Sequence, residues 1–131
     1  MKTENDFTII FHRFGSLSDG TKGSINELIL LYLENMSVHL AELARAVKAA
    51  DQKNMERIAH TACGLNETIG IYSLGSLFRN LESSAHTGQF SSIENTLKEI
   101  SDEFELVRER FRGYAESLMA SPPDTGDGNA S

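Results

Sequence analysis

One histidine in this sequence has neighbours that suit a group-transfer reaction. His60 lies in the segment from Asp51 to Gly70, where apolar residues recur with the period of an α-helix. At about 100° per residue, these apolar side chains gather on one side of the helix and His60 points to the other. Gly64 follows one turn later, and its missing side chain leaves the imidazole accessible. Neutral imidazole is a nucleophile near neutral pH, so a phosphoryl group or another protein could be brought to this ring.

Taken alone, the pair of His60 and Gly64 is a weak pattern. A surface histidine commonly has no special role, and a glycine inside a helix often marks close packing against a neighbouring helix. Glycine costs a helix about 1 kcal/mol relative to alanine. This cost indicates that Gly64 serves either access to His60 or close packing against another helix. The elements that position His60 are needed to decide between them.

Those elements are all predicted to be helices. The only prolines are Pro122 and Pro123, so the strongest helix breaker is absent from the preceding chain. Apolar residues follow the helical period between glycines, and no sustained alternation indicates a strand. The predicted helices, separated by short loops except for a longer one over 15–23, cover about residues 4–14, 24–50, 51–70, 73–87 and 91–119.

Capping residues support these boundaries. Ser24 with Glu27, and Ser91 with Glu94, match the capping box that satisfies free amides at a helix start. Asp51 is a suitable N-cap for the helix that carries His60.

The second helix has extra apolar residues beside its main stripe, and we expect the short first helix to cover them; they are Leu30, Leu31 and Leu33.

The last helix indicates how the helices assemble. Its apolar residues alternate between steps of four and three, from Ile93 to Leu118, which is the seam of an antiparallel bundle or of a coiled coil. Short loops favour packing within one chain. The sequence therefore predicts an all-α, antiparallel four-helix bundle with an additional short N-terminal helix over residues 1–119. Residues 120–131 are small, polar or proline and are predicted to form a disordered tail.

Composition excludes several classes of function. The 131 residues include 12 basic and 19 acidic side chains, a net charge of -7, and no positive stretch that could neutralise nucleic-acid phosphates. The longest apolar run, residues 28–33, is far too short to span a membrane. Cys63 is the single cysteine and suits a reducing, cytoplasmic compartment. The chain also lacks a glycine-rich GxxxxGK[ST] loop for ATP.

The wider pattern around His60 resembles the histidine-containing phosphotransfer (HPt) domains of two-component phosphorelays. The shared features are Ala-His, a glycine four residues later, a second glycine six residues after that, and Leu-Glu in the next helix. In this chain they are Ala59-His60, Gly64, Gly70 and Leu81-Glu82. The resemblance covers about residues 24–118.

The resemblance implies both a mechanism and partners. His60 would accept a phosphoryl group from a receiver-domain aspartate, or from a hybrid sensor kinase, and relay it to another response-regulator receiver. The chain would be a phosphocarrier rather than an enzyme, with no cofactor or metal of its own, because Mg²⁺ would belong to the receiver. Glu82 would orient the imidazole, and Gly64 would provide access.

Cys63 departs from the family pattern, in which a lysine usually follows the histidine by three residues. A phosphorylated histidine carries close to two negative charges, which that lysine would neutralise. Two arginines are candidates to replace the lysine, and Arg79 is slightly favoured over Arg57. His86 is a weaker candidate. Alternatively, nothing in this chain replaces it.

Two other functions stay open at this stage. Zinc accepts ligands of the kinds offered by His60, Cys63, His86, Glu67 and Glu82, although no second cysteine or repeated metal motif accompanies them. The regular last helix could instead form a coiled coil between chains. We expect a monomer, with the last helix buried inside its own bundle.

Overall fold

The structure is a computed structural model that describes residues 5–120, and all regular elements in this range are helical. Along the chain they are α1 (Phe7–Leu17), α2 (Lys22–Lys48), α3 (Gln52–Ile69), α4 (Tyr72–Thr87), the 3-10 helix η1 (Phe90–Ser92) and α5 (Ile93–Ala120). The predicted fold class, an all-α bundle with a short additional N-terminal helix, is confirmed.

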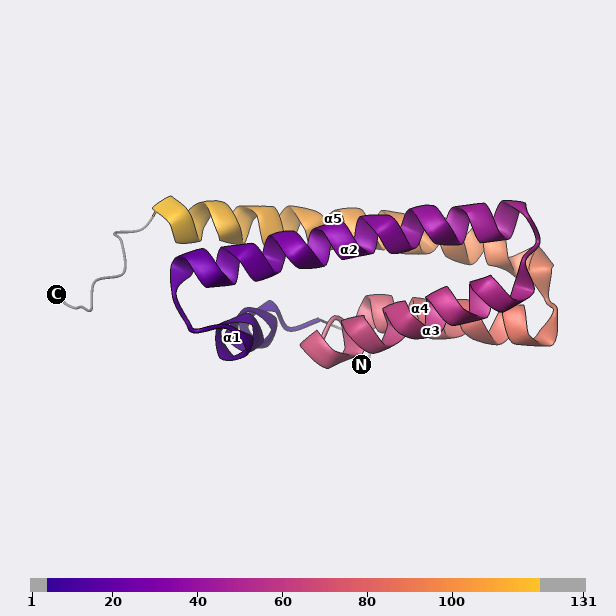
Figure 1. Cartoon of the computed structure of the whole chain (residues 1–131), viewed down its shortest axis with the longest axis horizontal. Coiled ribbons are helices and arrows are strands. Elements are labelled where there is room, and N and C mark those ends of the chain that lie inside the picture. Colours follow the sequence, from indigo (N-terminus) through magenta and orange to yellow (C-terminus); the bar gives the residue numbers. More distant parts are fainter. Residues whose placement is uncertain (1–4, 121–131) are drawn as a thin grey trace, which may run out of the picture.

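The four longer helices form two pairs. α2 lies beside α5, and α3 and α4 form the second pair on the other side of the core (Figure 1). Short turns join α2 to α3 and α3 to α4, so these neighbours run antiparallel. α1 is seen almost end-on in Figure 1 and therefore crosses the long helices at one end of the bundle, where it contacts α2 and α3.

The predicted apolar stripes face one another in a single core. On α5, the residues from Ile93 to Phe111 that follow the alternating four- and three-residue steps are almost all buried, and Leu97, Tyr114 and Leu118 are half-buried against the core. The largest fully buried side chains include Phe78, Phe104, Phe111, Ile29 and Met36. Because the α5 stripe is occupied within its own chain, it offers no free seam for a coiled coil between chains.

Aromatic side chains fix α1 to the end of the bundle. Phe11 stacks on Tyr114 of α5, with ring centroids 3.8 Å apart. Phe7 and Phe14 each meet Phe111 edge to face, at 6.0 and 5.4 Å. These are favourable geometries for aromatic pairs and explain why α1 lies against α5.

The expectation that α1 covers the extra leucines of α2 is wrong for two of the three. Leu30 and Leu31 are 55% and 51% exposed, whereas Leu33 packs half-buried against the core. The reason is that the apolar face of α1 is directed at the aromatic rings of α5 instead.

Both ends of α1 and the start of α2 differ from the prediction. α1 begins after Asp6, whose carboxylate accepts hydrogen bonds from the amides of Thr8 and Ile9, and it continues through Gly15 to Leu17. The loop predicted over 15–23 is therefore only four residues long. Thr21, not Ser24, caps α2, because the Thr21 hydroxyl accepts from the Ser24 amide at 3.3 Å.

The start of the last helix is also different. Ser91 lies inside η1 rather than at an N-cap, so the capping box predicted for Ser91 and Glu94 is wrong. Ser92 stabilises this tight turn with a hydroxyl bond to the carbonyl of Gln89 at 3.1 Å. The chain passes directly from the 3-10 turn into α5.

The last helix ends close to its predicted C-terminal boundary. α5 includes Ala120, one residue beyond the predicted boundary. The rest of the predicted tail, residues 121–131, lies outside the described residues. Among helices in the described range, none has both the length and the apolar character needed to cross a membrane.

Candidate phosphotransfer site on the seam between α3 and α4

The helix that carries His60 is held at both ends. Asp51 caps α3 by accepting a hydrogen bond from the Asn54 amide at 3.3 Å, as predicted. Gly70 ends the helix with φ of 91°, a left-handed conformation that glycine adopts without steric cost. Between these ends Ile58, Ala59 and Ala62 are buried, so the helix presents His60 on its outer side.

A regular seam of mostly polar residues lies where α3 and α4 meet. Four positions on α3, separated by steps of four, three and four residues, face four positions on α4 with the same spacing in the opposite direction. From one end of the seam to the other, Glu56 faces His86, His60 faces Glu82, Cys63 faces Arg79, and Glu67 faces Gly75.

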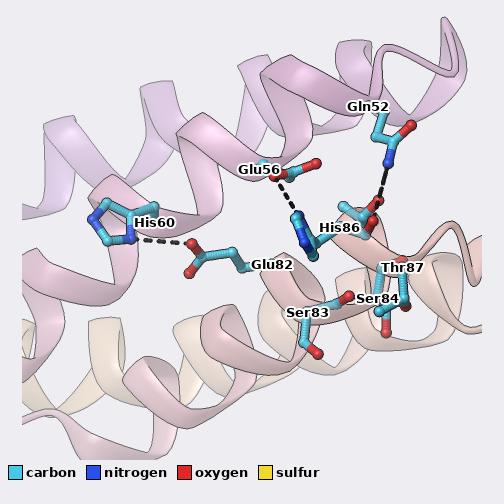
Figure 2. A network of polar contacts seen from close by, with 9 residues as sticks. Gln52, Glu56, His60, Glu82, Ser83, Ser84, His86 and Thr87 are labelled. Carbon is cyan, nitrogen blue, oxygen red and sulfur yellow. Dashed lines mark hydrogen bonds and ion pairs between the residues drawn. The ribbon is translucent and has the colours of Figure 1, made fainter.

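His60 and Glu82 form the central pair of this seam. Nδ1 of His60 lies 3.1 Å from Oε2 of Glu82, and the two side chains are 78% and 32% exposed. Because a carboxylate only accepts hydrogen bonds, this contact favours a proton on Nδ1 and a free lone pair on Nε2. Nε2 lies on the far side of the ring from Glu82 (Figure 2).

Open space surrounds the backbone next to this ring. A Cβ atom built on Gly64 would meet no heavy atom within 4 Å outside its own helix backbone. Close packing against another helix therefore does not explain this glycine, and its role in access to His60 stays a prediction. Thr61 is exposed as well.

The two candidate arginines have different partners. Arg79 donates from Nη2 to Oε2 of Glu67, and its side chain is 63% exposed. Arg57 donates to Oδ1 of Asn54 at 3.2 and 3.3 Å, within α3. Arg79 interacts with the Cys63 thiol across the seam, whereas Arg57 is directed at Asn54 on its own helix.

His86 occupies a second pair that mirrors the first. Its Nδ1 lies 3.3 Å from Oε1 of Glu56, and its ring is 76% exposed. Figure 2 shows this pair beside the first, with each helix contributing one histidine and one glutamate. The ring of His86 contacts Glu56 and lies on the opposite side of Glu82 from the free nitrogen of His60 (Figure 2).

The sequence model of the Hpt domain family matches residues 27–110, which is more than half of the chain and includes the whole seam. The chain belongs to the Hpt domain family. Among curated proteins, none has a significant match to this sequence.

A solved structure shares the fold of this Hpt domain. It is the crystal structure of histidine-containing phosphotransfer protein B from Pseudomonas aeruginosa PAO1. The two chains are 21% identical and superpose with a TM-score of 0.76, over 86% of this chain and 95% of the other. At this level of identity the likeness concerns the fold.

Family membership establishes the kind of chemistry. An Hpt domain is a phosphocarrier in a two-component phosphorelay and interacts with receiver domains, without the ATP site of a kinase. Within residues 5–120, no group of three or more His, Cys, Asp or Glu side chains is placed to hold a metal ion.

Cys63 of this Hpt domain is buried and poorly suited to react. Burial raises the pKa of its thiol, and the carboxylates of Glu67 and Glu82 raise it further, against the opposing effect of Arg79. The thiol is therefore neutral at physiological pH, and reactive cysteines act as thiolates.

A buried polar pair beneath the seam was missed in the sequence. Asn66 is fully buried; its Oδ1 accepts a 2.7 Å hydrogen bond from the Tyr32 hydroxyl, and its Nδ2 donates to the Ala62 carbonyl at 2.8 Å. Asn66 lies four residues after Ala62 and three before Ile69, so the helical period already placed it on the core face. This pair joins α2 to α3 inside the core.

Proposed function

We propose that His60 is the phosphoacceptor of this Hpt domain, and the only one. The observation that supports this is the exposed ring of His60, held at Nδ1 by Glu82 and open beside Gly64. These three properties occur together at His60: a fixed tautomer, a free Nε2 and room for a partner.

The reaction is a reversible transfer between an aspartate and a histidine. The Nε2 lone pair of His60 attacks the phosphorus of an aspartyl phosphate on a receiver, a P–N bond forms, and the P–O bond to the aspartate breaks. The aspartate leaves as a carboxylate. A second receiver then removes the phosphoryl group by the reverse steps, and the Mg²⁺ used in both belongs to the receivers.

Glu82 acts in this scheme as a positioning residue. Its carboxylate keeps the proton of His60 on Nδ1 and, after transfer, stabilises the positive charge that the phosphorylated ring can carry. Glu56 has the same relation to His86, but α4 ends one residue after that histidine. His60 differs from His86 in its surroundings: it lies in the middle of the seam with Gly64 one turn away, whereas His86 lies at the end of α4.

The remaining parts of the proposal concern partners and context. The partners are response-regulator receivers, a hybrid sensor kinase among the phosphodonors, and the domain over residues 1–119 works as a cytoplasmic monomer. Sedimentation at several concentrations tests the oligomeric state, and a single concentration-independent species is expected.

Transfer from radiolabelled receivers tests the acceptor. Phosphorylated receiver domains from the source organism are mixed with the protein, and the label transferred to the Hpt domain is measured. Phosphohistidine is expected to be stable to base and labile to acid. His60→Gln should abolish labelling and retain the helical fold. His86→Gln is the matched control, because His86 is equally exposed and also paired with a glutamate. Labelling that survives in His60→Gln contradicts the proposal.

A further inference from the structure

We infer that Arg79 is shared between two anions: Glu67 holds it in the unphosphorylated protein, and the phosphoryl group on His60 takes it over. Glu67 then sets how strongly the domain retains its phosphoryl group. This inference rests on His60 being the phosphoacceptor.

The position of Arg79 carries the first step. It faces Cys63, which is one turn beyond His60 on α3, and it precedes Glu82 by three residues on α4. Residues three apart on a helix are neighbours, so Arg79 and Glu82 lie on the same flank of α4, one turn apart. Nε2 of His60 is on the side of the ring away from Glu82 and His86 (Figure 2). Arg79 is thus the α4 cation with a path along the seam to that side.

Glu67 is placed to compete for this cation, and Gly75 makes its position possible. A Cβ atom on Gly75 would lie 2.7 Å from Cγ of Glu67, closer than carbon atoms can approach. The lack of a side chain at position 75 lets Glu67 lie across α4 and reach Arg79. The glycine is buried inside the helix, where it weakens helix formation, so its value lies in this close approach.

Charge decides where Arg79 goes after transfer. A phosphoryl group carries about -1.5 to -2 charges and three acceptor oxygens, against a single charge on Glu67. Arginine binds such groups with two parallel hydrogen bonds. The Arg79 side chain is 63% exposed, so the exchange requires no unpacking of the core.

The other charged groups near His60 do not replace Arg79 in this role. Glu56 and Glu82 are anions that repel a phosphoryl group, and His86 is held by Glu56. Arg57 donates hydrogen bonds to Asn54. It precedes His60 on α3, whereas Cys63 follows His60. Arg57→Ala is therefore the comparison variant.

The test uses protein phosphorylated chemically with potassium phosphoramidate and followed by ³¹P NMR. The resonance of phosphorylated His60 is the one that His60→Gln removes, and its shift against pH reports the apparent pKa of the phosphoryl group. Glu67→Gln should lower that pKa, because Arg79 becomes available. Arg79→Ala should raise it, and Arg57→Ala should have the smaller effect.

Two further variants separate competition from loss of a nearby charge. Glu56→Gln removes a carboxylate from the same seam without touching Arg79, so it should lower the phosphoryl pKa less than Glu67→Gln. Gly75→Ala keeps every charge but displaces Glu67, so it should act in the same direction as Glu67→Gln. In the Arg79→Ala background, the excess effect of Glu67→Gln over Glu56→Gln should disappear.

The equilibrium with a receiver gives a second readout. Glu67→Gln should raise the ratio of phosphorylated to unphosphorylated Hpt domain by about twofold to fivefold, the range for exposed ion pairs. Equal effects of Glu67→Gln and Glu56→Gln, or an effect of Glu67→Gln that persists in Arg79→Ala, would overturn the inference. Failure of every receiver to exchange label with His60 would instead refute the proposed function, while the NMR titration would still test Arg79.

Discussion

Nδ1 of His60 and Oε2 of Glu82 lie 3.1 Å apart across the seam between α3 and α4, and the opposite ring nitrogen faces away from the carboxylate. The contact joins two helices at the level of the exposed ring. The contact favours a proton on Nδ1 and leaves the lone pair of Nε2 free.

Glu82→Ala should slow phosphoryl transfer to His60 by about tenfold, because a fixed tautomer and a stabilised imidazolium are lost. The ¹⁵N chemical shifts of the His60 ring should show a larger fraction protonated at Nε2. Glu56→Ala is the control, since it removes the equivalent partner of His86. A transfer rate and ring shifts that match the parent would remove Glu82 from the mechanism.

Gly64→Leu should separate stability from activity. The structure has space at this position, so melting temperature should stay unchanged or rise, in line with a gain of about 1 kcal/mol in helix propensity. Transfer from receivers should fall sharply, because the new side chain overhangs His60. Gly64→Ala adds only a Cβ atom and should retain most of the activity. An active Gly64→Leu protein would show that access at this position is irrelevant.

Cys63→Lys should restore the cation that the family pattern has at this position. In the Arg79→Ala background, it should return the lifetime of phosphohistidine to within about twofold of the parent, as expected for an exposed charge pair. Cys63→Ser tests for an effect of losing the thiol alone. If Arg79→Ala and Arg57→Ala both behave like the parent, no compensation occurs and Cys63 is simply tolerated.

Ala50 offers a stability test far from the site. It has φ of 55° in the turn between α2 and α3, a left-handed conformation that is unfavourable for residues with a Cβ atom. Ala50→Gly should raise the free energy of unfolding by about 1 kcal/mol in denaturant titrations. Ala49→Gly should lower it, because Ala49 has φ of -86° and loses only chain stiffness.

Ionisation of the buried Tyr32 should make the free energy of unfolding fall at alkaline pH. Burial raises the pKa of Tyr32 above its ordinary value of 10.0, so the tyrosine ionises in the unfolded chain before it does in the folded one. Its contribution to stability is complete below pH 10.0 and is lost as pH rises above that value.

Tyr32→Phe should therefore reduce the alkaline loss of stability measured by urea denaturation. At neutral pH it should destabilise the protein by about 1–3 kcal/mol, because Oδ1 of Asn66 loses its partner while buried. Tyr114→Phe, on the half-buried aromatic cluster with α1, is the control. Equal pH profiles for parent and Tyr32→Phe would contradict this assignment.

The local order of the chain was predictable from the sequence. Apolar spacing between glycines predicted the helices, the core stripe of α5 and the outward direction of His60, because a helix repeats its faces with a fixed period. Asp51 and Gly70 predicted both ends of α3, since one caps free amides and the other adopts a left-handed conformation. The resemblance carried by Ala59-His60, Gly64, Gly70 and Leu81-Glu82 added the family.

Local ends that depend on competing caps were harder to predict. Thr21 and Ser24 can each cap a helix, and Ser91 can lie at a cap or inside a 3-10 turn. The energy differences between such alternatives are on the order of 1 kcal/mol, so the surrounding turn decides between them.

Only the tertiary structure decided which side chains meet across the helices. Helical spacing puts Arg79, Glu82 and His86 on one flank of α4, but their partners depend on the register of α4 against α3. The observed register sets Glu82 at His60, Arg79 at Cys63 and Glu56 at His86. That register comes from packing of the core and from the close approach at Gly75, interactions between residues far apart in sequence that no helical period can specify.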